Sequence, residues 1–133
     1  MTYYFCTFFD HRYLAKGLAL HHSLRQHCPQ FRLWILCFDQ HCYEVLSQLA
    51  LPEVHLIHQE EFEQSETGLL TAKASRTLAE YYFTCKPSLP WFVLNHHPEV
   101  DLITYLDADL FFFASPAPIY QDMANSSIAV VGH

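Results

Sequence analysis

Short apolar runs alternate with segments of helical periodicity along this chain, and no other sequence feature restricts the possible folds as strongly. The apolar runs cover residues 3–9, 31–38, 54–57 and 102–106, and each predicts a β-strand. Strands that are apolar along almost their whole length are typical of parallel sheets with helices on both faces. We therefore expect an α/β fold with a mostly parallel central sheet flanked by helices.

Between these runs, apolar residues recur with helical spacing. The periodicity predicts helices over residues 13–28, from Asp39 to before Pro52, and over residues 71–83, 89–95 and 116–124. Residues 59–66 are polar and acidic and predict a loop, and residues 84–88 predict a break between two helices. Residues 127–131 predict a fifth strand.

The length and charge of the chain limit what it can bind. Its 133 residues are enough for one core, so we expect a single domain over residues 1–133. The net charge of −7 argues against nucleic acid and anionic membranes, because both require clustered Lys and Arg. The sequence contains no leader-like N-terminus and no apolar stretch of membrane-spanning length. We therefore expect a cytoplasmic protein without a transmembrane segment.

The five cysteines are odd in number and include no Cys-x-x-Cys pair. Because several of them lie in or beside apolar runs, we expect them to be buried as small hydrophobic side chains in a reducing compartment. A zinc site formed by Cys37, His41 and Cys42 is the alternative interpretation.

Two aspartates one residue apart, Asp107 and Asp109, follow directly after the apolar run of residues 102–106. In an extended backbone their carboxylates lie on the same side of the chain, with Ala108 opposite. Neighbouring carboxylates repel each other unless a cation neutralises them, and oxygen ligands suit hard cations. The pattern therefore predicts a site for Mn²⁺ or Mg²⁺ at the carboxyl end of a buried strand, where ligands bind in open α/β sheets.

Two other interpretations of this Asp-Ala-Asp sequence remain. In the first, one aspartate caps the following turn and the other is solvated. In the second, the chain is a phosphatase of the haloacid dehalogenase type, in which the first aspartate is a nucleophile. That motif normally lies near the start of a chain, with Thr or Val at the position that Phe111 occupies here, and too few residues follow for its later motifs.

The sequence Tyr105-Leu106-Asp107-Ala108-Asp109 resembles the metal-binding motif of GT-A fold glycosyltransferases, especially those of the family-8 type. The likeness also includes residues 3–7 with Asp10 and Tyr13 after them, residues 19–36, and residues 113–119 with Ser115-Pro116. It implies the Rossmann-like nucleotide-sugar-binding fold of that family. It also implies an enzyme that takes a nucleotide-diphospho-sugar, above all a UDP-sugar, and transfers the sugar to a saccharide, lipid or protein acceptor.

The resemblance assigns roles to individual residues. Asp107 and Asp109 would hold Mn²⁺ or Mg²⁺, with Asp109 as the direct ligand of the ion that bridges the diphosphate. Thr7, Asp10 and Tyr13 would line the nucleoside pocket, where Tyr13 would stack on uracil and Asp10 would accept a hydrogen bond from its N–H. The alternative for Tyr13 is an ordinary aromatic residue on a helix face.

Basic residues before the metal motif are the candidates to bind the diphosphate or the sugar. They are Lys86 and Arg76, and the alternative for each is a solvated surface charge. The residues expected to bind the donor are therefore Thr7, Asp10, Tyr13, Lys86 and Asp107, and the resemblance identifies no catalytic residue.

The chain is much shorter than GT-A transferases, whose second half supplies the acceptor contacts and, in the family-8 type, a further His for the metal. We therefore expect these residues to be a truncated nucleotide-binding part, with an exposed apolar edge that favours self-association. A non-catalytic module that keeps nucleotide affinity without transfer is the alternative function.

Overall fold

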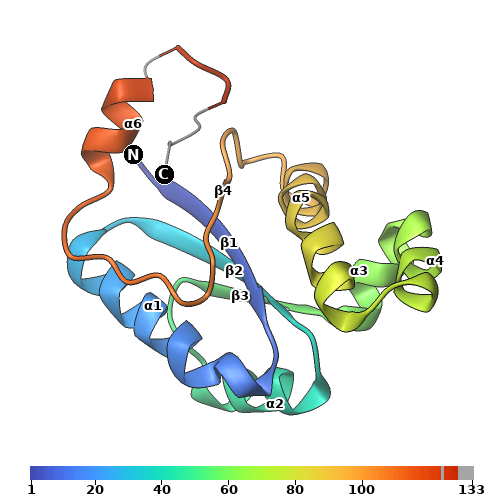
Figure 1. The fold of residues 1–133 in the computed structure, drawn as a ribbon. Helices are drawn as coiled ribbons and strands as arrows, with labels where there is room; N and C mark the ends of the chain where they lie inside the picture. The colour runs from blue at the N-terminus through green and yellow to red at the C-terminus, as the bar shows by residue number, and fades with distance from the viewer. Residues whose placement is uncertain (124, 129–133) are drawn as a thin grey trace.

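A parallel four-stranded sheet lies at the centre of the computed structural model, which describes residues 1–123 and 125–128 (Figure 1). The strands are β1 (Tyr3–Phe9), β2 (Phe31–Cys37), β3 (Val54–His58) and β4 (Thr104–Tyr105). Their order across the sheet is β3-β2-β1-β4, and every pairing is parallel. The structure thereby confirms the predicted α/β fold with a parallel central sheet.

The strands pair so that their carboxyl ends share one edge of the sheet. β1 and β2 pair along their whole lengths, and the last residue of β1, Phe9, lies opposite Cys37. β4 contributes only two pairs to β1, through Thr104 and Tyr105, so it is shorter than the predicted strand over residues 102–106. Because all four strands run in the same direction, the residues that follow β1, β2 and β4 meet at this edge.

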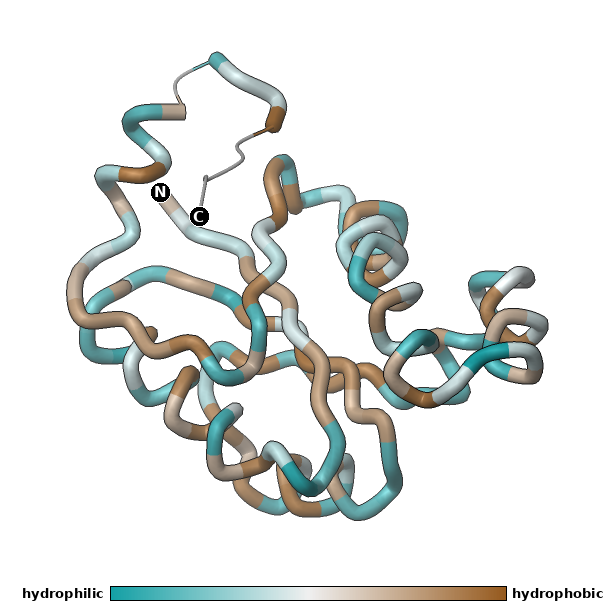
Figure 2. Tube along the Cα trace, in the orientation of Figure 1, coloured by the Kyte–Doolittle hydropathy of each residue, from teal (hydrophilic) through white to brown (hydrophobic). Residues whose placement is uncertain are grey.

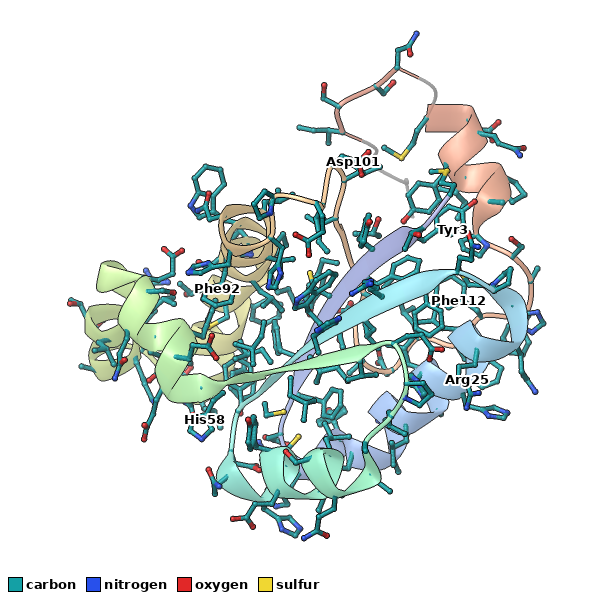
Figure 3. The ribbon with its side chains drawn as sticks, turned by 180° about the vertical axis from the view of Figure 1, so that it is seen from behind. Tyr3, Arg25, His58, Phe92, Asp101 and Phe112 are labelled. Atoms are coloured by element: carbon teal, nitrogen blue, oxygen red, sulfur yellow. The ribbon has the colours of Figure 1, made fainter. Side chains whose placement is uncertain are left out.

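Helices cover both faces of the sheet (Figures 1 and 3). One face packs against α1 (Leu14–His27) and α2 (Gln40–Leu49), and the other against α3 (Gln59–Ser65), α4 (Thr67–Ser75) and α5 (Leu78–His96). Phe5 and Phe9 of β1 belong to the core on the α1 face, whereas Cys6 and Phe8 belong to the core on the α5 face. Apolar residues accordingly follow the central strands in Figure 2.

Two short helical elements complete the described fold. A 3₁₀ turn, η1 (His11–Tyr13), joins β1 to α1, and α6 (Ala117–Met123) lies within the predicted helix over residues 116–124. The side chain of Asp10 begins η1 by accepting a hydrogen bond from the backbone N–H of Arg12. The turn therefore starts at the carboxyl end of β1, beside the edge where ligands bind in such sheets.

The predicted loop over residues 59–66 is wrong, because α3 occupies most of it. Phe62 of α3 is fully buried against Phe92 of α5, with ring centroids 5.6 Å apart. The buried carboxylate of Glu63 accepts hydrogen bonds from Tyr81 (2.6 Å), Lys73 (2.9 Å) and Gln59 (2.9 Å). Contacts with α4 and α5, rather than a local apolar pattern, stabilise this helix.

The predicted helix over residues 71–83 is divided between α4 and α5, because the chain leaves the helix at residues 76–77. The predicted break over residues 84–88 is wrong, because α5 runs through it. Thr77 starts α5 with a capping box, which satisfies backbone donors of the first turn. Pro87 and Pro90 lie inside the helix, where a proline removes a backbone hydrogen bond. Burial of one side of α5 against the sheet offsets this loss.

The predicted fifth strand over residues 127–131 lies mostly outside the described residues, and Ser127 and Ile128, which are described, are not in a strand. All five cysteines are buried with free thiols, which confirms that they pack as core side chains. Within the described part of the chain, no helix has the length and apolar character needed to cross a membrane.

Candidate functional site

A cavity of about 400 Å³ opens at the carboxyl edge of the sheet, between the ends of β1 and β4 and the side of α5. Five of the residues predicted from the sequence line it, namely Asp10, Tyr13, Lys86, Asp107 and Asp109. They come from three separate parts of the chain, because Asp10 and Tyr13 follow β1, Lys86 lies on α5, and the two other aspartates follow β4. The fold thus brings distant polar residues together at the edge where the sequence predicts them.

Asp107 and Asp109 lie in the segment that leaves β4. Both are exposed and line the cavity, whereas Ala108 between them packs into the core on the α1 face. A turn follows, in which the N–H of Leu110 donates to the carbonyl of Asp107 at 3.1 Å. The pair of carboxylates is therefore presented to the cavity from a short turn at the strand end.

A lysine from α5 partly neutralises this acidic pair. The ammonium of Lys86 lies 2.9 Å from Oδ1 of Asp107 and 5.6 Å from the centroid of the Tyr105 ring. The hydroxyl of Tyr105 also donates to Oδ1 of Asp107, at 3.1 Å. Burial, and then the charge of Asp107, raises the pKa of Tyr105, so its hydroxyl stays protonated and acts as a donor. Asp107 thus has a cationic partner and a hydrogen-bond donor on the same oxygen.

Asp10 is the most buried carboxylate of the cavity, with 5% of its surface exposed. Its Oδ1 accepts from the backbone N–H of Arg12 (3.0 Å), and its Oδ2 accepts from Nε (3.0 Å) and Nη2 (2.5 Å) of Arg12. The hydroxyl of Tyr82 on α5 adds a fourth donor, 3.1 Å from Oδ2. Burial raises the pKa of Asp10, but these hydrogen bonds outweigh it and hold the pKa below its ordinary value. Asp10 is therefore an ionised acceptor.

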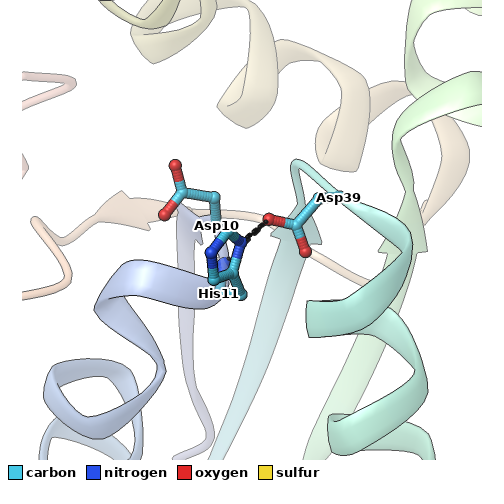
Figure 4. A group of neighbouring side chains, drawn as sticks. All are labelled: Asp10, His11 and Asp39. Carbon is cyan, nitrogen blue, oxygen red and sulfur yellow. Dashed lines mark hydrogen bonds and ion pairs between the residues drawn. The ribbon is translucent and has the colours of Figure 1, made fainter.

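Asp39, at the end of β2, forms a neighbouring network with His11 (Figure 4). Its Oδ1 caps α2 by accepting from the N–H of Cys42 at 2.7 Å, and its Oδ2 accepts from His11 N–H (2.9 Å) and bonds to His11 Nδ1 (2.7 Å). Burial raises the pKa of Asp39, but the two backbone N–H donors and the imidazole lower it below its ordinary value.

The described residues contain a further arrangement of metal-ligand atoms, in which Asp10, His11 and Asp39 place one atom each within 4.8 Å of one another (Figure 4). Backbone and side-chain donors already bind both carboxylates, and the Arg12 guanidinium adds positive charge, so we interpret this group as a helix-capping network. Cys37, His41 and Cys42 do not form such a group in the described part of the chain, which argues against the alternative zinc site.

Two predicted residues lie outside the lining of the cavity. Thr7 is fully buried in β1, between Cys6 and Phe8, and its hydroxyl has no hydrogen-bond partner among the described residues. Strand alternation places the Thr7 side chain on the α1 face of the sheet, away from α5. Arg76 lies between α4 and α5, where its Nη1 donates to the hydroxyl of Thr84.

Tyr13, by contrast, lines the cavity with 44% of its surface exposed. The ammonium of Lys16, one turn later, lies 4.6 Å from the centroid of its ring. The exposed ring is therefore available to a planar ligand at this end of the cavity.

Sequence reasoning did not assign Tyr82 and Phe83 of α5 to the site, although with Phe8 and Tyr105 they form an aromatic wall of the cavity. Ala79, Tyr82 and Lys86 lie three to four residues apart on α5 and all face the cavity. This spacing is visible in the sequence, where an apolar helix face includes one lysine. The predicted break over residues 84–88 concealed it, because it assigned Tyr82 and Lys86 to different elements.

Sequence comparison identifies two bacterial proteins that are similar to this chain. No protein-family model matches the sequence. The uncharacterized protein YfnD of Bacillus subtilis (strain 168) is 34% identical over 132 residues, which are 99% of this chain and 42% of YfnD. The uncharacterized protein YfnF of the same strain is 35% identical over 128 residues, 96% of this chain and 42% of YfnF. The chain thus spans about two fifths of the length of these curated relatives.

A solved structure resembles the fold itself. The apo crystal structure of mouse xyloside xylosyltransferase 1 matches with a TM-score of 0.58 at 17% identity. The match covers 94% of this chain and 49% of the mouse protein. At this low sequence identity, the structural similarity is evidence for the fold alone. Together with the parallel sheet and its flanking helices, it shows that the chain has a Rossmann-like, glycosyltransferase-like fold.

Proposed function

We propose that this chain forms the donor-binding part of a glycosyltransferase that takes a nucleotide-diphospho-sugar, most simply a UDP-sugar, and transfers the sugar to an acceptor. The observation that carries the proposal is the cavity that gathers Asp10, Tyr13, Lys86, Asp107 and Asp109 at the carboxyl edge of a parallel sheet. Ligands of open α/β sheets bind at this edge. The fold supports a transferase, and the residues in the cavity support this class of donor.

Asp107 and Asp109 fit a divalent cation by their chemistry. They offer carboxylate oxygens, which Mn²⁺ and Mg²⁺ prefer, and both are exposed to the cavity. The ammonium of Lys86 already lies 2.9 Å from Asp107, so this position attracts a positive charge. When bound, the ion would supply Lewis-acid neutralisation of a diphosphate leaving group.

The other residues of the cavity provide complementary interactions for the rest of a nucleotide. The exposed ring of Tyr13 suits stacking on a base, and the ionised carboxylate of Asp10 suits an N–H or O–H donor of the nucleoside. Lys86 provides the cationic side chain that a diphosphate requires. The acidic net charge of the chain makes such local compensation necessary for binding an anion.

The test is calorimetric titration of UDP into the protein with Mn²⁺ and with EDTA. We expect binding with Mn²⁺ and a loss of affinity of about tenfold or more with EDTA or in Asp109→Asn. Asp101→Asn is the matched control, because it removes an exposed carboxylate that lies outside the cavity. UDP binding that neither EDTA nor Asp109→Asn weakens would contradict the proposal.

Sugar transfer needs its own measurement. Radiolabelled UDP-sugars are incubated with the protein and Mn²⁺, and both release of UDP and labelled product are followed. Turnover supports an enzyme, whereas metal-dependent UDP binding without hydrolysis or transfer supports a non-catalytic nucleotide-binding module.

A further inference from the structure

Tyr82 links α5 to Asp10, the buried carboxylate of the cavity, through a side-chain hydrogen bond. Its hydroxyl donates to Oδ2 of Asp10 at 3.1 Å, across 72 residues of sequence. The three other donors to Asp10 all belong to Arg12, two residues away, and the side chain of Arg12 is 57% exposed. Tyr82 is therefore the donor that fixes Asp10 relative to the opposite wall of the cavity.

The ring of Tyr82 is itself held by packing. It stacks on Phe38, with ring centroids 4.3 Å apart and planes at 18°, and lies 5.9 Å from the ring of Phe8. Phe8 lies in β1 and Phe38 directly follows β2, so contacts with two strand ends restrict the position of the hydroxyl. A side chain held in this way provides a hydrogen bond at little further entropic cost.

The hydrogen bonds also determine which oxygen of Asp10 can meet a ligand. Each carboxylate oxygen has about two acceptor positions. Oδ2 accepts from three donor groups, whereas Oδ1 accepts from one, the backbone N–H of Arg12. Oδ1 thus keeps acceptor capacity for a ligand N–H or O–H. Both Asp10 and Tyr82 line the cavity.

We propose that Tyr82 is a positioning residue, which holds the carboxylate of Asp10 oriented so that its Oδ1 can accept a hydrogen bond from a bound nucleoside. The inference rests on the proposed function, because it assumes that the cavity binds the nucleoside part of the donor. It adds a residue that contributes to affinity through Asp10.

The first test compares UDP binding, with Mn²⁺, by wild-type protein, Tyr82→Phe and Tyr81→Phe. Tyr81, also on α5, is the matched control. Its hydroxyl donates to the buried carboxylate of Glu63 in α3, and it does not line the cavity. We expect Tyr82→Phe to weaken UDP binding about three- to tenfold at pH 7. Tyr81→Phe should bind UDP like the wild-type protein, although it loses an equivalent hydrogen bond.

The pH profile separates positioning from a general loss of structure. Without the Tyr82 donor the pKa of Asp10 rises, so Asp10 is protonated at higher pH and loses its acceptor role earlier. Because the pKa of Asp10 lies below its ordinary value, the ratio of the dissociation constants of Tyr82→Phe and wild type should stay constant from pH 7 to about 5 and increase as the pH falls further towards 4. Other groups that titrate in this range are the same in both proteins and cancel from the ratio.

A double-mutant cycle with Asp10→Asn tests whether Tyr82 acts through Asp10. The effect of Tyr82→Phe should largely disappear in the Asp10→Asn background. Wild-type affinity in Tyr82→Phe, or an equal loss in both backgrounds, would overturn this inference and leave the proposed function intact. A wild-type protein that does not bind UDP would instead overturn the proposed function, and this inference with it.

Discussion

The indole N–H of Trp34 donates a hydrogen bond to Nε2 of His97, with 3.2 Å between the two nitrogens. Trp34 lies in β2 with only 1% of its surface exposed, and His97 ends α5. Nε2 of His97 must therefore be unprotonated, and its other nitrogen, Nδ1, lies 3.4 Å from the carboxylate of Glu99. This bond ties the C-terminal end of α5 to the centre of the sheet.

Removing the acceptor should leave a buried donor without its partner. We expect His97→Ala to lower the free energy of unfolding by about 1–3 kcal/mol, because a buried unsatisfied N–H pays its full desolvation cost. Urea unfolding followed by circular dichroism measures this difference. His22→Ala, which truncates an exposed histidine of α1, is the control and should change stability by less than about 0.5 kcal/mol. Equal stability of the two variants would contradict the prediction.

His55 should make the protein less stable in mild acid. Burial, followed by the charge of Arg32, lowers the pKa of His55 below its ordinary value. The unfolded chain therefore takes up a proton near pH 6.5 while folded His55 is still neutral, and stability falls as the pH drops below about 6.5. Thermal melts between pH 8 and pH 5 should show a smaller decrease for His55→Gln than for wild type. An unchanged slope would contradict this assignment.

Gly17 allows α1 to approach β1 closely. A Cβ atom at this position would lie 2.3 Å from two ring carbons of Phe9, which is 3% exposed and cannot move aside freely. We expect Gly17→Ala to destabilise the protein by about 1–3 kcal/mol through overpacking, although alanine favours helices. Gly68→Ala is the control, because nothing lies within 4 Å of the position that a Cβ atom would take there. It should stabilise α4 by about 0.5–1 kcal/mol in the same urea titration.

Lys86 and a metal ion should compete for Asp107. The two side chains are 36% and 51% exposed, so their ion pair contributes less than about 1 kcal/mol to stability. Lys86→Met should therefore leave the melting temperature almost unchanged and strengthen binding of Mn²⁺ alone about two- to fivefold. The same variant should weaken UDP binding in the presence of Mn²⁺, because the diphosphate loses a cationic partner.

The control for Lys86→Met is Arg25→Met, which removes an exposed positive charge from α1. Calorimetry with Mn²⁺ alone, and then with UDP and Mn²⁺, measures both effects. If Lys86→Met and Arg25→Met change Mn²⁺ affinity equally, the effect is one of net charge rather than competition at Asp107.

The sheet could be predicted from sequence because its strands are apolar on both faces, as β1 and β2 show. The position of the acidic pair could be predicted for the same reason, since Asp107 comes directly after an apolar run. The loop expected over residues 59–66 became a helix because Phe62 and Glu63 make their stabilising contacts with residues far along the chain. A local polarity pattern carries no information about such contacts.

The cavity itself was only partly predictable. Asp10, Asp107 and Asp109 follow strand ends, which parallel topology brings to one edge. The role of Tyr82 depends on its stacking against Phe38 and on the rotation of α5, and neither is encoded in the local pattern. The sequence predicts a helix break over residues 84–88, whereas packing against the sheet keeps α5 continuous through Pro87.

Among the described residues, the backbone that carries Asp107 and Asp109 forms hydrogen bonds to other elements only at its two ends. The N–H of Leu106 donates to the carbonyl of Cys6 in β1 (2.9 Å), and the N–H of Phe112 donates to the hydroxyl of Ser23 in α1 (3.0 Å). Opening of the span between these anchors need not break the pairing of β1 with β2. Its amides should therefore exchange with deuterium by local fluctuation, well before global unfolding, and a ligand that bridges the two carboxylates should slow that exchange.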